Sequence, residues 1–283
     1  MCAVLSMVVF AATALAKRVA MVVGITDYTH SRKLPNARND AASMTQALQA
    51  SGFDVVQSLD QDQTEIYDTL DRFYAKASAA ETAVFFFAGH GIQFDGVNYL
   101  VPKSAELRSI SRLKQETVAL QDIISEIEKR AGITLVFLDA CRDNPLAEEL
   151  QRSLKGTTRS AAVSRGLAPM EIRNPDTLLV FAAAPGKTAS DGAGANSPFT
   201  AALDQNIAEP GVEIEQMMKR VARDVRSATG GTQAPERLSK LTTEFIFTPA
   251  QSTKALTVEP ARPASDTPSC KGPNPPISCL WNR

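Results

Sequence analysis

Short apolar runs that alternate with amphipathic segments constrain the fold of this chain more than any other feature of its sequence. A run of about four to eight residues that is apolar throughout is typical of a parallel strand buried on both faces. The predicted strands are Val19–Ile25, Phe53–Leu59, Ala83–Ala88, Ile133–Leu138 and Leu178–Ala182, with a late strand at Phe245–Phe247. Because helical patterns separate them, their order predicts an α/β fold: a mainly parallel, doubly wound sheet with helices on both faces.

Apolar residues at helical spacing separate the strands and predict the helices. One helix begins after the N-cap candidate Asn36 and ends at Gly52. The others are expected at Thr64–Ser78, Leu120–Lys129, Pro198–Ile207 and Glu213–Ser227. Within Gln93–Val101, the dipeptide Asp95-Gly96 predicts a hairpin instead of a helix.

The first 16 residues form a segment of their own. Residues 2–16 carry no charge and are mostly apolar, and two basic residues end the run. About 14 apolar residues are too few to span a bilayer comfortably but suit the apolar core of a signal peptide, and Ala14-Leu15-Ala16 fits a cleavage site. We therefore expect residues 1–16 to be a signal peptide that is removed together with Cys2. We also expect that the chain has no stable membrane span and that it is located in the periplasm or outside the cell. A positively charged N-terminal region is missing, so a buried first strand or a mis-assigned start stays open.

Residues 249–283 read as a Pro-rich, disordered tail that follows a folded domain over residues 17–248. Proline recurs through the tail and large apolar residues are scarce in it. Two interpretations stay open for Cys270 and Cys279: a small disulfide loop formed in an oxidising compartment, or two unrelated thiols.

One internal segment lacks the alternation of strand and helix. Residues 146–176 are rich in Arg, Ser, Ala, Gly and Pro, with a short helix expected only at Ala147–Leu154. An irregular segment of this length inside a compact domain is usually functional or disordered.

The composition of the chain argues against several classes of ligand and binding site. The formal net charge of −1 gives no electrostatic reason to bind nucleic acid or an anionic membrane. Two histidines and four cysteines exclude a histidine-rich metal site and a disulfide scaffold, and no cysteine spacing fits zinc. The chain has no Gly-rich dinucleotide or phosphate loop and no Gly-x-Ser-x-Gly turn, so we expect no cofactor and no metal.

Two predicted strands end in the residues best suited to catalysis. Gly89-His90-Gly91 follows the third strand, and Asp139-Ala140-Cys141 follows the fourth. In open α/β sheets the active crevice lies beyond these ends. An imidazole beside a thiol can take its proton and leave a nucleophilic thiolate, and the backbone N–H groups of Gly91 and Cys141 are candidate oxyanion donors. Taken singly, His90 could be a turn residue and Cys141 a buried small hydrophobe, while His30 reads as a surface residue.

These residues resemble the caspase superfamily, especially its paracaspase and bacterial metacaspase-like (orthocaspase) branches. Two motifs carry the likeness, VFFFAGHGIQFDGVNYLVP around His90 and TLVFLDACRDNP around Cys141. Their separation, 141 − 90 = 51 residues, is close to the roughly 50 typical of caspases. The resemblance covers residues 17–248 and implies a caspase–hemoglobinase fold. It also implies an endopeptidase with His90 and Cys141 as catalytic dyad and the Gly91 and Cys141 amides in the oxyanion hole.

An acid two residues before Cys141 departs from the Gln-Ala-Cys pattern of true caspases. Asp139 favours an arginine or lysine before the cleaved bond, because a carboxylate pairs with a cation. The resemblance to metacaspases and paracaspases implies two further pocket acids, Asp40 in the helix after the first strand and Asp191 after the fifth. Asp40 could instead favour the first turn of its helix, and Asp139 could orient a loop.

The resemblance therefore implies a cysteine endopeptidase acting on proteins or peptides with a basic residue before the cleaved bond. Lys155, Arg159 and Arg165 lie in the segment that corresponds to the junction of the family's large and small subunits, so we expect self-cleavage after one of them. Three alternatives stay open: a catalytically silent interaction module, a caspase-like enzyme that cleaves after aspartate, and a cysteine hydrolase of small amides. Calcium activation, familiar in metacaspases, has no support here because no EF-hand spacing occurs. An exposed sheet edge would permit a homodimer.

Overall fold

A computed structural model describes residues 17–141, 147, 150–152, 163–164, 167–184, 187 and 189–250, without the side chains of Cys141, Val163 and Ser164. Contacts divide the chain into one unit that ends at Pro249 and a second unit, Ala250–Arg283. Several predictions lie outside the described residues: the signal peptide, the tail with Cys270 and Cys279, and the candidate cleavage residues Lys155, Arg159 and Arg165.

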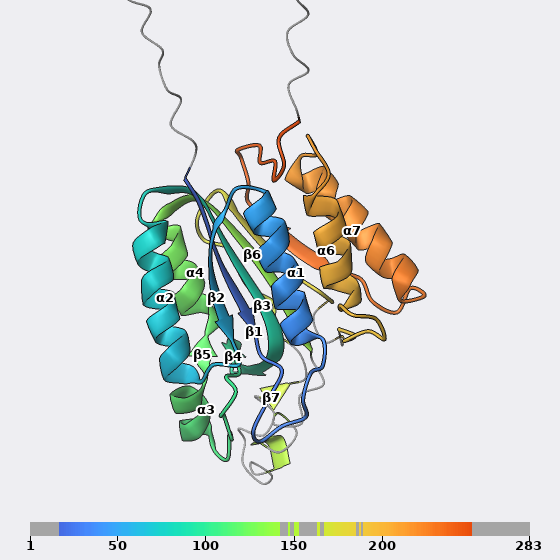
Figure 1. Cartoon of the computed structure of the whole chain (residues 1–283). Helices are drawn as coiled ribbons and strands as arrows, with labels where there is room; N and C mark the ends of the chain where they lie inside the picture. The colour runs from blue at the N-terminus through green and yellow to red at the C-terminus, as the bar shows by residue number, and fades with distance from the viewer. Residues whose placement is uncertain are drawn as a thin grey trace, which may run out of the picture. The chain divides into compact units, whose positions relative to one another are not determined.

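A mainly parallel sheet forms the centre of the fold (Figure 1). Its principal strands are β1 (Arg18–Gly24), β2 (Asp54–Leu59), β3 (Ala80–Phe94), β6 (Ala131–Cys141), β8 (Thr177–Phe181) and β9 (Glu236–Ser239). They lie in the order β2-β1-β3-β6-β8-β9, and only the pair β8–β9 is antiparallel. The predicted α/β fold is confirmed, and β3 and β6, the strands that carry the two motifs, are neighbours.

Helices cover both faces of this sheet, as the alternation predicted. On one face lie α1 (Ala37–Ala50), α6 (Pro198–Ile207) and α7 (Ile214–Ala228), and on the other α2 (Gln63–Ala77) and α4 (Leu120–Glu128) (Figure 1). Asn36 precedes α1, but its side chain does not cap the helix. Its amide donates instead to the carbonyl oxygen of Asp191, which ties the start of α1 to the loop before α6.

Short elements extend the sheet beyond the parallel strands. β4 (Val97–Leu100) forms the predicted hairpin with β3, and Asp95 and Gly96 both have positive φ, 51° and 77°, as a tight hairpin turn requires. The sequence pattern did not predict α3 (Ile110–Glu116), β5 (Val118–Ala119) or β7 (Val163–Ser164). β5 pairs with β4, and β7 pairs with the far part of β3.

The predicted late strand at Phe245–Phe247 is wrong. Phe245 and Phe247 are buried and lie against the ring of Phe53, while Ile246 makes only an isolated bridge to Glu213. The run is apolar because it packs on the core, not because it joins a ladder. Among the described residues the last strand is β9, whose sequence Glu-Arg-Leu-Ser has little apolar character.

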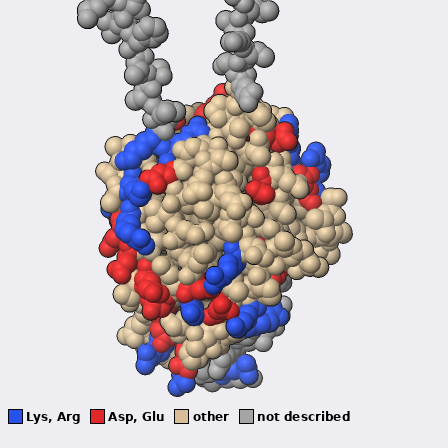
Figure 2. All heavy atoms as spheres, in the orientation of Figure 1, with Lys and Arg blue, Asp and Glu red and all other residues tan. Residues whose placement is uncertain are grey.

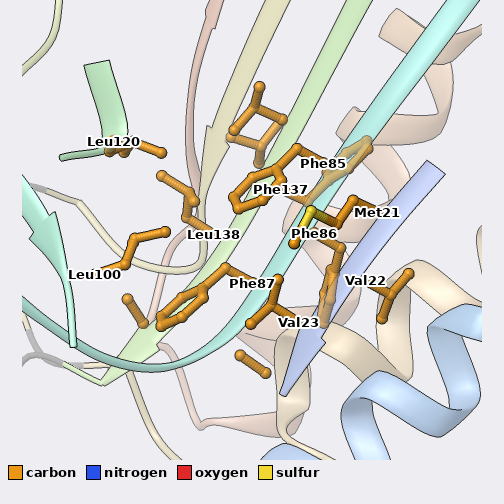
Figure 3. Close-up of a cluster of buried hydrophobic side chains, with 14 of the residues drawn as sticks. Met21, Val22, Val23, Phe85, Phe86, Phe87, Leu100, Leu120, Phe137 and Leu138 are labelled. Atoms are coloured by element: carbon orange, nitrogen blue, oxygen red, sulfur yellow. The ribbon is translucent and has the colours of Figure 1, made fainter. Parts of the chain in front are cut away.

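The core lies on both faces of β1, β3 and β6. Phe85, Phe86 and Phe87 are fully buried, and Figure 3 shows them packed with side chains of the neighbouring strands, among them Met21 and Phe137. Successive strand residues face opposite sides of a sheet, so three consecutive buried phenylalanines mean that both faces of β3 are covered. His90 therefore lies on a strand whose position is fixed from both sides.

Within the ranges described, no helix has the length and apolar character needed to cross a bilayer. On the face shown in Figure 2, basic and acidic side chains are mixed around a broad area without charges. On this face the near-zero net charge thus reflects basic and acidic side chains that lie among one another.

Candidate active site

His90 and Cys141 are direct partners across two neighbouring strands. In the parallel ladder of β3 and β6, Ala88 pairs with Asp139 and Gly89 with Ala140, and His90 pairs with Cys141 as the last partners. Adjacent strands lie about 4.8 Å apart, so the two backbones are close. The sequence predicted that His90 follows the end of its strand, but β3 continues to Phe94 and only its parallel pairing ends at His90.

The buried imidazole of His90 has one nitrogen engaged and one without a described partner. Nε2 lies 2.8 Å from the carbonyl oxygen of Arg32. A carbonyl only accepts, so Nε2 carries the hydrogen and Nδ1 holds the lone pair of the neutral ring. Among the described atoms, Nδ1 is buried and has no hydrogen-bond partner. This tautomer leaves Nδ1 available to take a proton.

Burial keeps this imidazole neutral. It lowers the pKa of His90 to about 4, with a smaller lowering from the Arg32 charge and an opposing effect of the hydrogen bond to the Arg32 carbonyl. At neutral pH the ring is therefore uncharged, which is the state that a general base needs.

Tyr28 holds His90 from the loop after β1. The backbone N–H of His90 donates to the Tyr28 hydroxyl at 2.6 Å, and the two rings lie 4.4 Å apart between centroids. A Cβ on Gly89 would lie 2.7 Å from the same hydroxyl oxygen, so the close approach of Tyr28 requires glycine there. Sequence reasoning missed Tyr28, although the glycine beside the histidine is a signal of a close neighbour.

Gly91, the predicted oxyanion donor, lies one residue beyond His90 in the hairpin part of β3. Its Cα partner is Leu100, and a Cβ at this position would lie 2.9 Å from a methyl carbon of Leu167. Leu167 follows β7 in the irregular segment between β6 and β8. Leu167 therefore packs beside the residue that follows His90, and the oxyanion roles of Gly91 and Cys141 stay predictions.

The three predicted pocket acids come together beside the dyad. Asp40 of α1 and Asp139 of β6 are buried, and both accept hydrogen bonds from Ser197: its backbone N–H donates to Asp40 at 2.9 Å, and its hydroxyl donates to Asp139. Asp191 is half-buried in the loop before α6, close enough for its charge to act on both other acids. Sequence reasoning found the acids but missed Ser197 and Thr200, which bind them.

Burial and mutual repulsion disfavour the charged forms of these acids. Burial, then the charge of Asp139, raises the pKa of Asp40. Burial and the Asp191 charge raise the pKa of Asp139, while hydrogen bonds from Ser197 and Thr200 lower it. Burial also raises the pKa of Asp191. A cation placed among the three carboxyls would relieve this repulsion.

No metal site accompanies the cluster in the part of the chain that the structure describes. Groups of three or more His, Cys, Asp or Glu side chains arranged to hold a metal ion do not occur among those residues.

Known proteins resemble this chain in sequence and in fold. Residues 17–246 match the family model of the caspase domain. The chain is 28% identical over 126 residues to mucosa-associated lymphoid tissue lymphoma translocation protein 1 of Homo sapiens, and 29% identical over 126 residues to its Mus musculus homologue. The match covers 44% of this chain and 15% of each relative, so the chain spans a small part of their length. The crystal structure of caspase-1 from Spodoptera frugiperda shares the fold, with a TM-score of 0.59 and 15% identity over 84% of this chain and 92% of that chain. The chain therefore belongs to the caspase domain family of cysteine peptidases.

Proposed function

We propose that this chain is a cysteine endopeptidase that uses His90 and Cys141 as its dyad. The observation that carries the proposal is the pairing of His90 with Cys141 at the end of the β3–β6 ladder, with Nδ1 of a neutral His90 available as a base. Nδ1 takes the proton from the Cys141 thiol, and the thiolate attacks the peptide carbonyl. The imidazolium then gives that proton to the leaving amine, and water hydrolyses the thioester.

The acids beside the dyad support cleavage after arginine or lysine. Asp40, Asp139 and Asp191 bring up to three negative charges into a partly buried cluster, which matches a basic side chain and repels an aspartate. Cleavage after aspartate is the weaker alternative on this ground. Protein or peptide substrates with a basic residue before the cleaved bond are thus the proposed partners.

A panel of fluorogenic peptides that differ only in the residue before the cleaved bond tests the proposal. Hydrolysis after Arg and Lys, but not after Asp or Ala, is expected. Turnover after Asp alone would overturn the specificity, and turnover of small amides alone would favour the amide hydrolase. No turnover of any member would favour the silent interaction module.

Self-processing in residues 146–176 is part of the proposal. Val163 and Ser164, which follow Lys155 and Arg159 but precede Arg165, pair with Phe94 and Gln93 of β3. Beyond all three candidate sites, the side-chain amide of Asn98 both accepts from the N–H and donates to the carbonyl of Ala168. These contacts, with β8 inside the sheet, would hold the two pieces together after the chain is cut.

We therefore expect wild-type protein to mature into two fragments that co-elute in gel filtration, while Cys141→Ala stays intact. Intact-mass measurement of both proteins after incubation checks this. Identical masses would contradict self-processing without touching the peptide specificity.

Export to the periplasm or the outside of the cell, and a homodimer formed through a sheet edge, remain proposals that rest on the sequence alone. Mass determination of the N-terminus after expression in a secreting host tests the first. Sedimentation velocity tests the second.

A further inference from the structure

Ser197 connects the two buried acids of the cluster. It precedes α6, where its hydroxyl oxygen accepts the N–H of Thr200 at 2.9 Å and so caps the helix. Its own N–H donates to Oδ1 of Asp40, and its hydroxyl donates to Oδ2 of Asp139. The Thr200 hydroxyl, in the first turn of α6, donates to the same Oδ2 at 2.8 Å. All four side chains are buried.

The hydrogens available to these groups fix which acid carries the charge. The Ser197 oxygen already accepts a backbone N–H, so its single hydrogen points to Asp139. Thr200 adds a second donor to the same oxygen, which makes Oδ2 of Asp139 an acceptor twice over. A carboxylate accepts in this way, and hydrogen bonds to the charged form favour it. Asp40 accepts the backbone N–H of Ser197, and a side-chain hydrogen bond from Asn196 lowers its pKa by a smaller amount. Neither is a second hydroxyl donor on one buried oxygen, as Asp139 has, so the cluster's proton belongs on Asp40.

We propose that Ser197 and Thr200 are positioning residues of the specificity pocket: they hold Asp139 as the carboxylate that receives the substrate's basic side chain, while Asp40 carries a proton until that side chain binds. The inference rests on the proposed specificity for basic residues. It adds that binding of the cation releases a proton from Asp40, so recognition depends on pH through this pair.

The groups that face the pair agree with this assignment. The cluster consists of Asp40 from α1, Asp139 from β6 and Asp191 from the loop before α6. The charge of Arg32, in the loop after β1, lowers the pKa of Asp191. Burial and the Asp139 charge raise the pKa of Asp40, while the two hydroxyls lower the pKa of Asp139 against the effect of its burial, so both effects favour the proton on Asp40. An arriving cation favours both charged forms and so displaces the proton.

Thr200→Val removes one hydroxyl at nearly constant volume and is the sharpest test. Benzamidine, a cation shaped like an arginine head group, is titrated into Cys141→Ala protein by calorimetry between pH 5.5 and 9, and KM and kcat for an arginine peptide are measured in the active background. Loss of a hydrogen bond to a charged group predicts a roughly 10-fold weaker Kd and higher KM at the acid end, with kcat almost unchanged. The loss should shrink toward pH 9, because Asp139 then ionises without help.

Two variants separate this effect from packing. Thr200→Ser keeps the hydroxyl and should restore the wild-type pH profile. Thr82→Val makes the same change at a buried threonine of β3 whose hydroxyl has no hydrogen-bond partner among the described atoms, and should bind benzamidine as wild type does.

The outcomes are distinct. A Thr200→Val protein that binds benzamidine within twofold of wild type at every pH, or a loss that is equal at all pH values, overturns the inference. So does a wild-type pocket that binds no benzamidine. Benzamidine binding with the expected pH dependence, but no cleavage of arginine peptides, supports the inference and overturns only the proposed peptidase activity.

Discussion

His90→Gln should lower kcat/KM for an arginine peptide by about 10³-fold or more, whereas His30→Gln should leave it within twofold. General base catalysis contributes on the order of 10²- to 10⁴-fold, and the upper part of that range applies to a base paired directly with its nucleophile. These are the chain's only two histidines. His30 is a matched control, since it is exposed and its imidazole lies 3.9 Å from the Glu106 carboxylate, with no hydrogen bond between its side chain and His90 among the described residues.

Glutamine is the informative replacement because it separates position from chemistry. Its amide N–H can still donate to the Arg32 carbonyl, which is what His90 Nε2 does, but it has no basic nitrogen to replace Nδ1. Initial rates, together with thermal melting of each variant, measure the effect. Folded His90→Gln protein with activity within tenfold of wild type would contradict the assignment of His90 as the base. Cys141→Ala provides the floor of the assay.

The catalytic strands could be predicted because their signal is local. Runs such as Ala83–Ala88 and Ile133–Leu138 are buried on both faces, so composition alone marks them, and His90 and Cys141 follow directly in the chain. Their pairing in one register could not be deduced, since register depends on how two distant segments align. The structure supplies that alignment through ten paired positions from Ala80–Ala131 to His90–Cys141.

Elements that are held by tertiary contacts have no comparable local pattern in the sequence, so they could not be predicted from it. β9 is half-buried and polar, and it is a strand because β8 offers it a free edge. Phe245 and Phe247 are apolar because they cover the core beside Arg18, whose guanidinium donates to the Phe247 carbonyl. Tyr28, Ser197 and Thr200 are ordinary residues in the sequence. They matter only because folding brings them onto His90, Asp40 and Asp139.

Asp139→Asn should lower kcat/KM for arginine peptides by roughly 10²- to 10³-fold and at the same time raise the melting temperature at pH 8. Removing one partner of a buried, hydrogen-bonded charge pair costs on the order of 2–5 kcal/mol, and this cost sets the expected fall in kcat/KM. Asparagine keeps an acceptor oxygen for the Ser197 and Thr200 hydroxyls, so the pocket's shape is preserved. Asp68→Asn, an exposed acid on α2, is the control and should change neither quantity.

The gain in stability follows from the direction of the pKa shifts. Asp139 and Asp40 both have folded pKa values above those of the unfolded chain, because burial and repulsion disfavour their charges. The folded state therefore holds more protons than the unfolded state at intermediate pH, and stability falls as pH rises through the folded pKa values. The Asp139→Asn substitution removes one of these charges, so the difference in melting temperature should grow from pH 5 to pH 8.

Thermal melts and peptide kinetics on the same preparations decide whether Asp139 serves substrate recognition or the stability of the fold. A variant that is more stable at pH 8 yet discriminates poorly between arginine and alanine peptides would identify Asp139 as an acid kept for recognition at the expense of stability. A variant that loses stability at pH 8 more than at pH 5, and still prefers arginine, would instead make Asp139 a structural residue. The pocket's specificity would then have to come from Asp40 and Asp191.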